Sequence, residues 1–166
     1  MRAPKPLKIY LAGGLFNAGE RLHNLFLEQA LERLGYTVIL PQREALKFFD
    51  GDKFNTEGIV EDCSRTAADK ENIFVGNSDG PDADSGACVE YGIALTCTGR
   101  AVVYRTDFRT DPDREIGVNA MLRGKGTEFV YEPCFFTELD QVENYYRDLA
   151  QKIDKKIDLI IASFSS

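Results

Sequence analysis

Short apolar segments of strand length alternate along this chain with longer segments of helical periodicity, and this alternation constrains the fold more than any other feature. The expected strands are Lys8 to Ala12, Thr37 to Leu40, Asn72 to Gly76, Ala101 to Tyr104 and Thr127 to Tyr131. Short apolar strands separated by helices are typical of a parallel sheet covered by helices on both faces. The sequence therefore predicts an α/β domain with a five-stranded, mostly parallel sheet.

Helical spacing and end signals predict four helices around this sheet. The first carries Leu22, Leu25, Phe26, Ala30 and Leu34 at helical spacing and stops at Gly35. The others are Thr56, as N-cap, to about Lys70, then Ser85 to Thr98 before Gly99, and Thr137, as cap, to Lys156. We find no internal repeat or linker, so we expect residues 1–166 to form a single domain.

The segment from Gln42 to Asn55 has no regular apolar pattern, and we interpret it as an ordered functional loop. Simple periodicity would leave its three aromatic rings, Phe48, Phe49 and Phe54, exposed to solvent. Exposed rings that lie close together often mark a contact surface. Contact with a substrate or a partner would explain them here.

Charge and hydropathy exclude several classes of partner. The chain has 20 Lys and Arg against 27 Asp and Glu, which gives a formal net charge of -7 at pH 7. Such a chain has no overall field that would attract phosphate backbones or anionic membranes. Its apolar runs are far shorter than the roughly 20 residues that span a bilayer, and no long apolar signal core begins the chain. We therefore expect a cytoplasmic protein that binds neither nucleic acid nor membrane.

Histidine and cysteine usage narrows the possible chemistry. His23 is the sole histidine, and it lies within an amphipathic helical pattern that indicates a surface or boundary position. The four cysteines, Cys63, Cys88, Cys97 and Cys134, form no C-x-x-C pair. A structural zinc site and a Ser-His-Asp or Cys-His scheme are therefore disfavoured. Carboxylates are the expected reactive groups.

The predicted topology brings four loops to one crevice, because ligands bind outside the carboxyl ends of parallel strands. These loops follow the first four strands and begin near Gly13, Pro41, Asn77 and Arg105. Gly13 and Gly14 would let the backbone approach a ligand closely, and a tight turn explains the pair equally well. Their surroundings contain neither a dinucleotide fingerprint nor a P-loop lysine.

Glu90 is an anomaly, because its neighbours in the segment GACVEYGIAL are small or apolar. A buried carboxylate without a partner is costly, so Glu90 requires either a partner or a function. Held at a crevice, it could attack a sugar carbon as a nucleophile. A solvent-facing position or an arginine partner would explain it as well.

Three aspartates precede the same helix, and they too have two interpretations. Asp79, Asp82 and Asp84 could simply form a turn and cap the helix. Alternatively, Asp84 lies six residues before Glu90, which corresponds to about 9 Å of helix axis and spans a nucleoside-sized ligand. Two carboxylates that flank a glycosidic bond are suited to acid-assisted displacement at an anomeric carbon.

Three motifs together resemble the nucleoside 2-deoxyribosyltransferase family, over about Lys8 to Tyr131. The motifs are IYLAGGLFN at 9–17, DADSGACVEYGIA at 82–94 and VNAM at 118–121. The middle motif, D-x-G-x-x-x-E-x-G-x-A, is the specific one. The resemblance implies a flavodoxin-like (Rossmann-like) three-layer α/β sandwich. It also implies base exchange on 2'-deoxyribonucleosides through a covalent deoxyribosyl-glutamate intermediate, with net retention and without metal or cofactor.

The same resemblance assigns roles to individual residues. Glu90 would be the nucleophile that attacks C1′, Tyr10 would orient it, and Asp84 and Asp62 would bind the base and exchange its proton. Asn119 and Met121 would reach the pocket of a neighbouring subunit, which implies a homo-oligomer with shared active sites. The further expected substrate-binding residues are Gly13, Leu15, Phe16, Gln42, Asp82 and Gly86.

Two other functions remain open from the sequence. One is a 2'-deoxynucleoside 5'-phosphate N-glycosidase of the same superfamily, in which water accepts the sugar. Its phosphate would need donors near the first turn, where GGLFNAGE offers no basic residue. The other is a non-catalytic nucleoside-binding or nucleotide-binding module, which would not require Glu90. The sequence does not distinguish purine from pyrimidine substrates.

Overall fold

The five predicted strands form one sheet, in which every pair of neighbouring strands is parallel. The computed structural model describes residues 5–51, 53–109 and 117–164. The strand order is β2-β1-β5-β6-β7. The strands are β1 (Lys8–Ala12), β2 (Val38–Ile39), β5 (Asn72–Asn77), β6 (Ala101–Arg105) and β7 (Thr127–Tyr131). This arrangement confirms the predicted flavodoxin-like α/β class.

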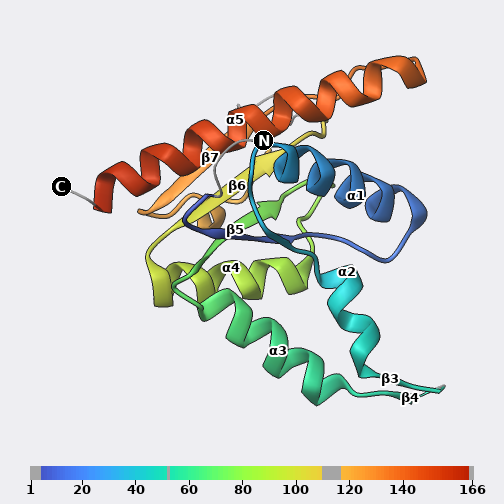
Figure 1. The fold of residues 1–166 in the computed structure, drawn as a ribbon, viewed down its shortest axis with the longest axis vertical. Helices are drawn as coiled ribbons and strands as arrows, with labels where there is room; N and C mark the ends of the chain where they lie inside the picture. The colour runs from blue at the N-terminus through green and yellow to red at the C-terminus, as the bar shows by residue number, and fades with distance from the viewer. Residues whose placement is uncertain (1–4, 52, 110–116, 165–166) are drawn as a thin grey trace.

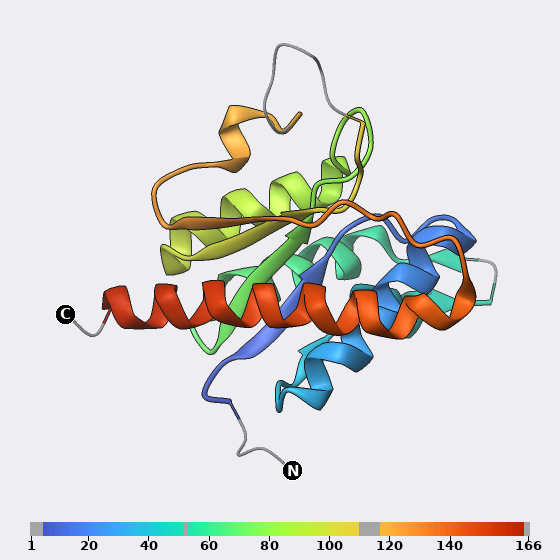
Figure 2. The same ribbon diagram turned by 90° about the horizontal axis from the view of Figure 1, so that it is seen from above.

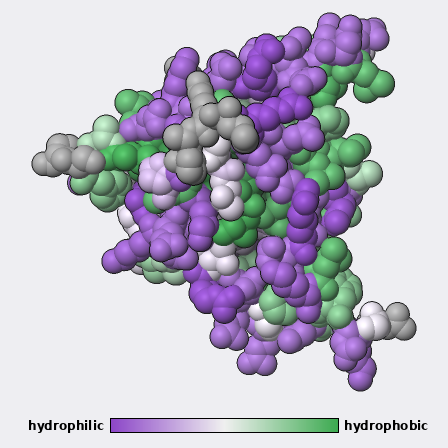
Figure 3. Space-filling model, in the orientation of Figure 1, coloured by the Kyte–Doolittle hydropathy of each residue, from purple (hydrophilic) through white to green (hydrophobic). Residues whose placement is uncertain are grey.

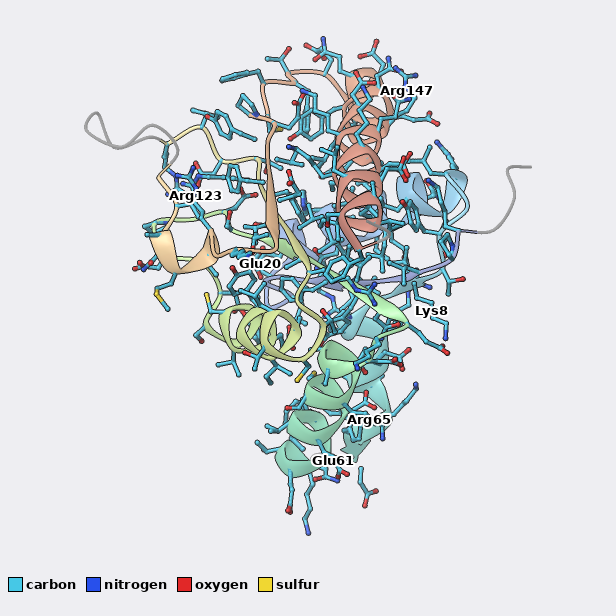
Figure 4. All side chains as sticks on the ribbon, turned by 90° about the vertical axis from the view of Figure 1, so that its left-hand side faces the viewer. Lys8, Glu20, Glu61, Arg65, Arg123 and Arg147 are labelled. Atoms are coloured by element: carbon cyan, nitrogen blue, oxygen red, sulfur yellow. The ribbon has the colours of Figure 1, made fainter. Side chains whose placement is uncertain are left out.

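Helices cover both faces of the sheet, as predicted (Figure 1). One layer holds α1 (Ala18–Arg33) and α5 (Val142–Phe164), and the other holds α3 (Thr56–Ala68) and α4 (Ser85–Thr98). Figure 2 shows the long α5 extending across the molecule in front of the sheet. In Figure 4, the labelled Glu61 and Arg65 on α3 lie at the opposite end of the molecule from Arg147 on α5. The sheet is therefore the middle of three layers.

Strand alternation divides the core into two apolar clusters. Ile9 and Leu11 of β1 point into the cluster beneath α1 and α5, whereas Tyr10 and Ala12 point into the cluster beneath α3 and α4. In Figure 3, hydrophilic side chains cover much of the face in view, and apolar ones gather near its centre and along its right-hand side. The alternation matters for function because it directs the Tyr10 hydroxyl toward α4.

The segment expected to be an ordered loop is indeed ordered, but it folds into short regular elements. It contains α2 (Pro41–Glu44), a 3-10 turn at Ala45–Phe48, and the antiparallel hairpin of β3 (Phe49–Asp50) and β4 (Lys53–Phe54). Pro41 occupies the first turn of α2, where its missing N–H costs nothing. Gly51 takes φ +60 between the two strands, which favours glycine. Elements of two to four residues are too short for periodicity to detect.

Two helix starts differ from the prediction. Asn55, and not Thr56, caps α3, because its side chain accepts the Gly58 N–H at 3.0 Å. Before α5, a 3-10 turn at Leu139–Gln141 follows Glu138, so the helix proper begins five residues after the expected cap. The same helix continues to Phe164, beyond the expected end. Its continuation buries Ile157 and Ile160 against the sheet.

None of the helices within the described residues is both long enough and apolar enough to cross a membrane.

Candidate active site

A cavity of about 250 Å³ opens beside the carboxyl ends of β1 and β2, between the hairpin segment and the helices α3 and α4. We call it the Glu90 cavity. Most of its wall is apolar, and it is formed by Gly13, Leu15, Phe16, Ile39, Pro41, Ala45, Phe48, Phe54, Ile59, Gly86 and Ala87. Its polar lining residues are Tyr10, Glu44, Asp62, Cys63, Thr66, Asp84 and Glu90. Carboxylates thus face a predominantly apolar space.

Glu90 lies half-buried on α4 and faces this cavity. The Tyr10 hydroxyl donates a hydrogen bond of 2.8 Å to its Oε1 atom. Among the residues that the structure describes, no cation forms an ion pair with Glu90. Burial raises the pKa of Glu90 above its usual range, and the hydrogen bond from Tyr10 opposes this increase. Neither an arginine partner nor a fully solvated position therefore explains this residue.

Tyr10 is suited to hold the Glu90 carboxylate in place. Its side chain is almost completely buried on β1, with an exposed fraction of 2%. Burial and the nearby charge of Glu90 both raise the pKa of the Tyr10 phenol far above its usual range. The phenol therefore keeps its proton at any physiological pH and remains a donor.

Asp84 and Asp62 line the same cavity from two different helices. Asp84 is the N-cap of α4, where its Oδ1 atom accepts the Ala87 N–H at 2.9 Å. Asp62 lies on α3 and forms an ion pair with Arg65 one turn later. The capping interpretation of Asp84 is therefore confirmed, and its carboxylate also shares a cavity with Glu90.

The first-turn glycines are explained by packing within the chain. A Cβ atom at Gly13 would lie 2.9 Å from the Cβ atom of Asn77, and one at Gly14 would lie 2.7 Å from the Glu20 carboxyl carbon. Gly13 therefore excludes a side chain, whereas a side chain at Gly14 would require the Glu20 carboxylate to shift. Gly13 additionally lines the Glu90 cavity, together with the predicted Leu15, Phe16 and Gly86.

Four predicted site residues do not line this cavity. The Gln42 side chain is buried and bridges α1 to α2, because it accepts from Asn24 at 3.1 Å and donates to the Arg21 carbonyl at 3.3 Å. Asp82 is exposed beside other hollows. Asn119 and Met121 line a separate hollow near α4, and Met121 is 80% exposed.

Several cavity residues had no assigned role in the sequence. Cys63 lies four residues after Ile59 and three before Thr66 on α3, and the face that they share forms a wall of the cavity. Phe48 and Phe54 were singled out only as exposed rings, and both contribute to the opposite wall. The shared helical face of α3 could have been detected in the sequence. The positions of the Phe48 and Phe54 rings could not, because they depend on the fold of the hairpin segment.

A second and larger hollow, of about 870 Å³, lies on the other side of the loop after β1, against α1. We call it the His23 crevice. His23 lies within α1 and is half-buried between core and surface, as expected, and its two ring nitrogens are each 2.9 Å from a tyrosine hydroxyl, that of Tyr104 or Tyr146. Burial lowers the pKa of His23, so the ring is neutral at pH 7.

The carboxylate of Asp79 in this crevice is also fully engaged. It accepts hydrogen bonds from the Thr106 amide and hydroxyl, both at 2.5 Å, from the Asp107 amide at 2.8 Å and from Asn77 at 3.1 Å. These bonds join the loops that follow β5 and β6. The segment DFRTDPDR at 107–114 is rich in charge, and within it Asp107 pairs with Arg109; residues 110–114 lie outside the described residues.

Within residues 5–51, 53–109 and 117–164, no group of three or more His, Cys, Asp or Glu side chains could hold a metal ion.

Comparison with known proteins relates this chain to one family. The family model described as nucleoside 2-deoxyribosyltransferase matches residues 9–121. A conserved protein from Enterococcus faecalis V583 has a similar structure, with a TM-score of 0.60 and 23% identity over 87% of this chain and 99% of that chain. A 2-deoxyribosyltransferase from Bacillus psychrosaccharolyticus has a TM-score of 0.53 and 22% identity over 86% and 95%. A search of the curated proteins finds no match.

Proposed function

Because the chain belongs to the nucleoside 2-deoxyribosyltransferase family, we propose that it transfers 2-deoxyribose between nucleobases through a covalent intermediate on Glu90. The observation that carries this proposal is the state of Glu90. Its carboxylate is half-buried, lacks a cation among the described residues, and is held by Tyr10 toward an apolar cavity. Weak solvation and a fixed orientation are what a carboxylate nucleophile requires.

In the first half-reaction, a Glu90 oxygen forms a bond to C1′ of the sugar. The bond between C1′ and the base nitrogen breaks, and its electron pair passes to that nitrogen. The departing base takes up a proton, which Asp84 or Asp62 on the cavity wall supplies. General acid assistance of this kind contributes roughly 10² to 10⁴ in rate.

In the second half-reaction, a different base attacks C1′ of the deoxyribosyl ester and releases the Glu90 carboxylate. The proton of the incoming base returns to the aspartate, so no net proton is consumed. Each displacement inverts C1′, and two inversions give net retention. If water attacked in place of the second base, the same intermediate would yield free deoxyribose.

The charge of the cavity supports nucleosides as substrates in preference to their 5′-phosphates. None of the described residues that line the Glu90 cavity is Lys or Arg, whereas four are carboxylic acids. A phosphate dianion would find no cationic partner there and would be repelled by these carboxylates.

We infer that the active enzyme is a homo-oligomer in which Asn119 and Met121 contribute to the cavity of a neighbouring chain. Both residues are exposed and lie outside the Glu90 cavity of their own chain. An 80% exposed methionine is expensive to leave in water and is a common interface residue. Light scattering on wild type and Met121→Asp, together with activity, tests this inference.

The proposed function is tested by incubating the protein with deoxyinosine plus adenine, and separately with thymidine plus adenine. We expect deoxyadenosine, separated by chromatography, from the wild type and none from Glu90→Gln. The donor that works distinguishes a purine-only enzyme from one with broad specificity. Free base without a new nucleoside would identify an N-glycosidase, especially with deoxynucleoside monophosphates. No reaction with any donor would favour a non-catalytic binding module.

A further inference from the structure

The hydrogen-bonding side chains of the Glu90 cavity are unequally divided between donors and acceptors. Four carboxylates line it, those of Glu44, Asp62, Asp84 and Glu90. An ionised carboxylate only accepts hydrogen bonds. Among the described residues that line the cavity, none is Asn, Gln, Lys, Arg, His or Trp, the types whose side chains carry N–H donors. A ligand in this cavity therefore meets mainly acceptors.

The lining side chains that could donate are either engaged or weak. The Tyr10 hydroxyl gives its proton to Glu90 at 2.8 Å. The Thr66 hydroxyl donates to the backbone carbonyl of Asp62, also at 2.8 Å. The thiol of Cys63 is a weak donor by nature. The side chains of the described cavity wall thus leave no strong donor for a ligand.

The amide of Gln42, which was expected to bind substrate, does not correct this imbalance. An amide both donates and accepts, so it could have bonded either kind of group on a ligand. Its side chain is instead buried, accepts from Asn24 at 3.1 Å and donates to the Arg21 carbonyl at 3.3 Å. Both functions of the amide are therefore used between α1 and α2.

Backbone donors of the cavity wall are also engaged where the chain enters α1 and α4. The Phe16 N–H donates to the Glu20 carboxylate at 2.7 Å, and the Ala87 N–H donates to Asp84 at 2.9 Å. Pro41, where α2 begins, has no N–H to donate. The acceptor character of the wall therefore extends to these parts of the backbone.

The carboxylates, in contrast, retain capacity for a ligand. Lys47 contacts one oxygen of Glu44, and Arg65 contacts one oxygen of Asp62. Neither cation is among the described residues that line the cavity. One oxygen of Asp84 caps α4. A carboxylate offers about four acceptor positions, so each of these groups can accept a further hydrogen bond.

We propose that the Glu90 cavity selects nucleobases by their hydrogen-bond donors and prefers those with an exocyclic amino group. This inference rests on the function proposed above, which makes a nucleobase the ligand. The rings of Phe16, Phe48 and Phe54 offer apolar surface to the face of any base, so the polar edge of the base decides.

The chemistry of that edge divides the natural bases into two groups. An amino group donates to a carboxylate in a charge-assisted hydrogen bond, whereas a carbonyl would face acceptors and find no donor. Adenine, cytosine and guanine carry an exocyclic amino group, and hypoxanthine, uracil and thymine do not. We therefore expect the first three to be the better substrates.

Free bases test this selection without any transfer of sugar. NMR titration of the wild type with adenine, purine and 6-methylpurine gives three dissociation constants. These probes differ only in the group at one ring position, and the methyl group matches the size of the amino group without its donors. We expect adenine to bind about tenfold or more tightly than the other two, as one charge-assisted hydrogen bond provides. Equal affinities, or no binding of any probe, would overturn the proposal.

Neutral variants of three carboxylates identify the acceptor. Glu44→Gln, Asp62→Asn and Asp84→Asn each replace an acceptor-only group with an uncharged amide. The preference for adenine over 6-methylpurine should be largely lost in at least one of them. Asp82→Asn is the matched control, because it removes the same charge from an exposed residue outside the Glu90 cavity and should keep the preference. A preference that survives in all three cavity variants would contradict the proposal.

The transfer reaction provides a separate readout. When adenine and 6-methylpurine compete for deoxyribose from one donor nucleoside, the ratio of the two products reports the selection and does not depend on the overall rate. We expect the adenine product to predominate. Equal amounts of both products would overturn the selection and leave the proposed function intact. If the wild type forms neither product, the proposed function fails, while the dissociation constants still decide the selection.

Discussion

The Glu90 cavity and the His23 crevice lie on opposite sides of the loop after β1, and Asp84 lines both. Both hollows contain titratable side chains, yet these groups are used differently. In the crevice, His23 and Asp79 are bonded to several neighbours that satisfy them. In the cavity, Glu90 is held by the neutral Tyr10 hydroxyl and has no counter-charge among the described residues.

This difference shows that the number of polar groups in a hollow is a poor guide to reactivity. The larger hollow has more charged side chains, but its hydrogen bonds hold loops together. The smaller one keeps a carboxylate in a state that is unfavourable for folding and useful for attack on a sugar. Strain of this kind is tolerated where function requires it.

The largest expected effect comes from Glu90→Gln, which removes the nucleophile and preserves the shape. We expect base exchange to fall by at least about 10³-fold, the scale seen when a covalent nucleophile is lost. Because burial raises the pKa of Glu90, its ionised form costs stability at neutral pH. The variant should therefore unfold at the same temperature or higher, which calorimetry measures. A large loss of stability in Glu90→Gln would instead indicate that Glu90 has a structural role, like His23 and Asp79 in the crevice.

The next largest effect is expected from Asp84→Asn, which separates the two roles of that residue. Asparagine caps a helix as well as aspartate does, so the free energy of unfolding should change by only a few tenths of a kcal/mol. Activity should fall by roughly 10²-fold or more, because the carboxylic proton is lost. Asn17→Ala, which removes the cap of α1 but no carboxylic acid, is the control, and it should lower stability more than activity. Full activity in Asp84→Asn would show that its role is the cap alone.

A third effect concerns the crevice, where His23→Ala should cost stability and spare activity. The hydroxyls of Tyr104 and Tyr146 would lose their partner, at about 1–3 kcal/mol for each buried group left unsatisfied. His23 lines the crevice and not the Glu90 cavity. The activity of the folded fraction should therefore remain within about twofold of wild type. Denaturant titration and initial rates measure the two quantities.

The pH dependence of stability adds a further readout for His23. Burial lowers its pKa in the folded protein below the ordinary value of 6.5, so the unfolded chain takes up the proton first. Stability from the neutral ring is therefore complete above pH 6.5 and falls as the pH drops below it, by at most about 1.4 kcal/mol per unit. His23→Ala should lack this dependence. If the pH dependence of stability persisted in His23→Ala, other titratable groups would be responsible for it.

The smallest effect is expected from Tyr10→Phe, with Tyr36→Phe as the matched control. Each tyrosine hydroxyl donates to one carboxylate, to Glu90 at 2.8 Å and to Asp154 at 2.7 Å. Loss of the Tyr10 bond should raise the pKa of Glu90, move the acid limb of kcat to higher pH and lower activity about tenfold near that limb. The Tyr36 variant should leave the profile unchanged. Equal effects in both would mean that Tyr10 contributes only to the fold.

The sheet and its layers could be predicted because each strand has a recognisable local sequence pattern. Lys8 to Ala12 is a short apolar run between a proline and two glycines, and this local pattern needs no tertiary context. The hairpin at Phe49 and Phe54 could not be predicted, because strands of two residues carry no period. Helix ends were less certain for the same reason, as the cap at Asn55 shows.

The site was predictable only where one motif contains it. Asp84 and Glu90 lie six residues apart on one helix, so helix geometry places them together. Tyr10 reaches Glu90 from a strand of the sheet, and the family resemblance, not a residue pattern, paired the two. Gln42 was expected to bind substrate because it follows a strand at the expected crevice. Its position in the sequence gave no information about the buried hydrogen bonds that it forms with α1.

The hairpin of β3 and β4 lies outside the five-stranded sheet, yet Phe54 from it forms part of the cavity wall. Mutations that lengthen this hairpin or exchange its rings would leave the central core intact. The nucleophile, in contrast, is built into a helix that the core holds in place. Selection could therefore diversify which base is accepted while the sugar chemistry is inherited unchanged.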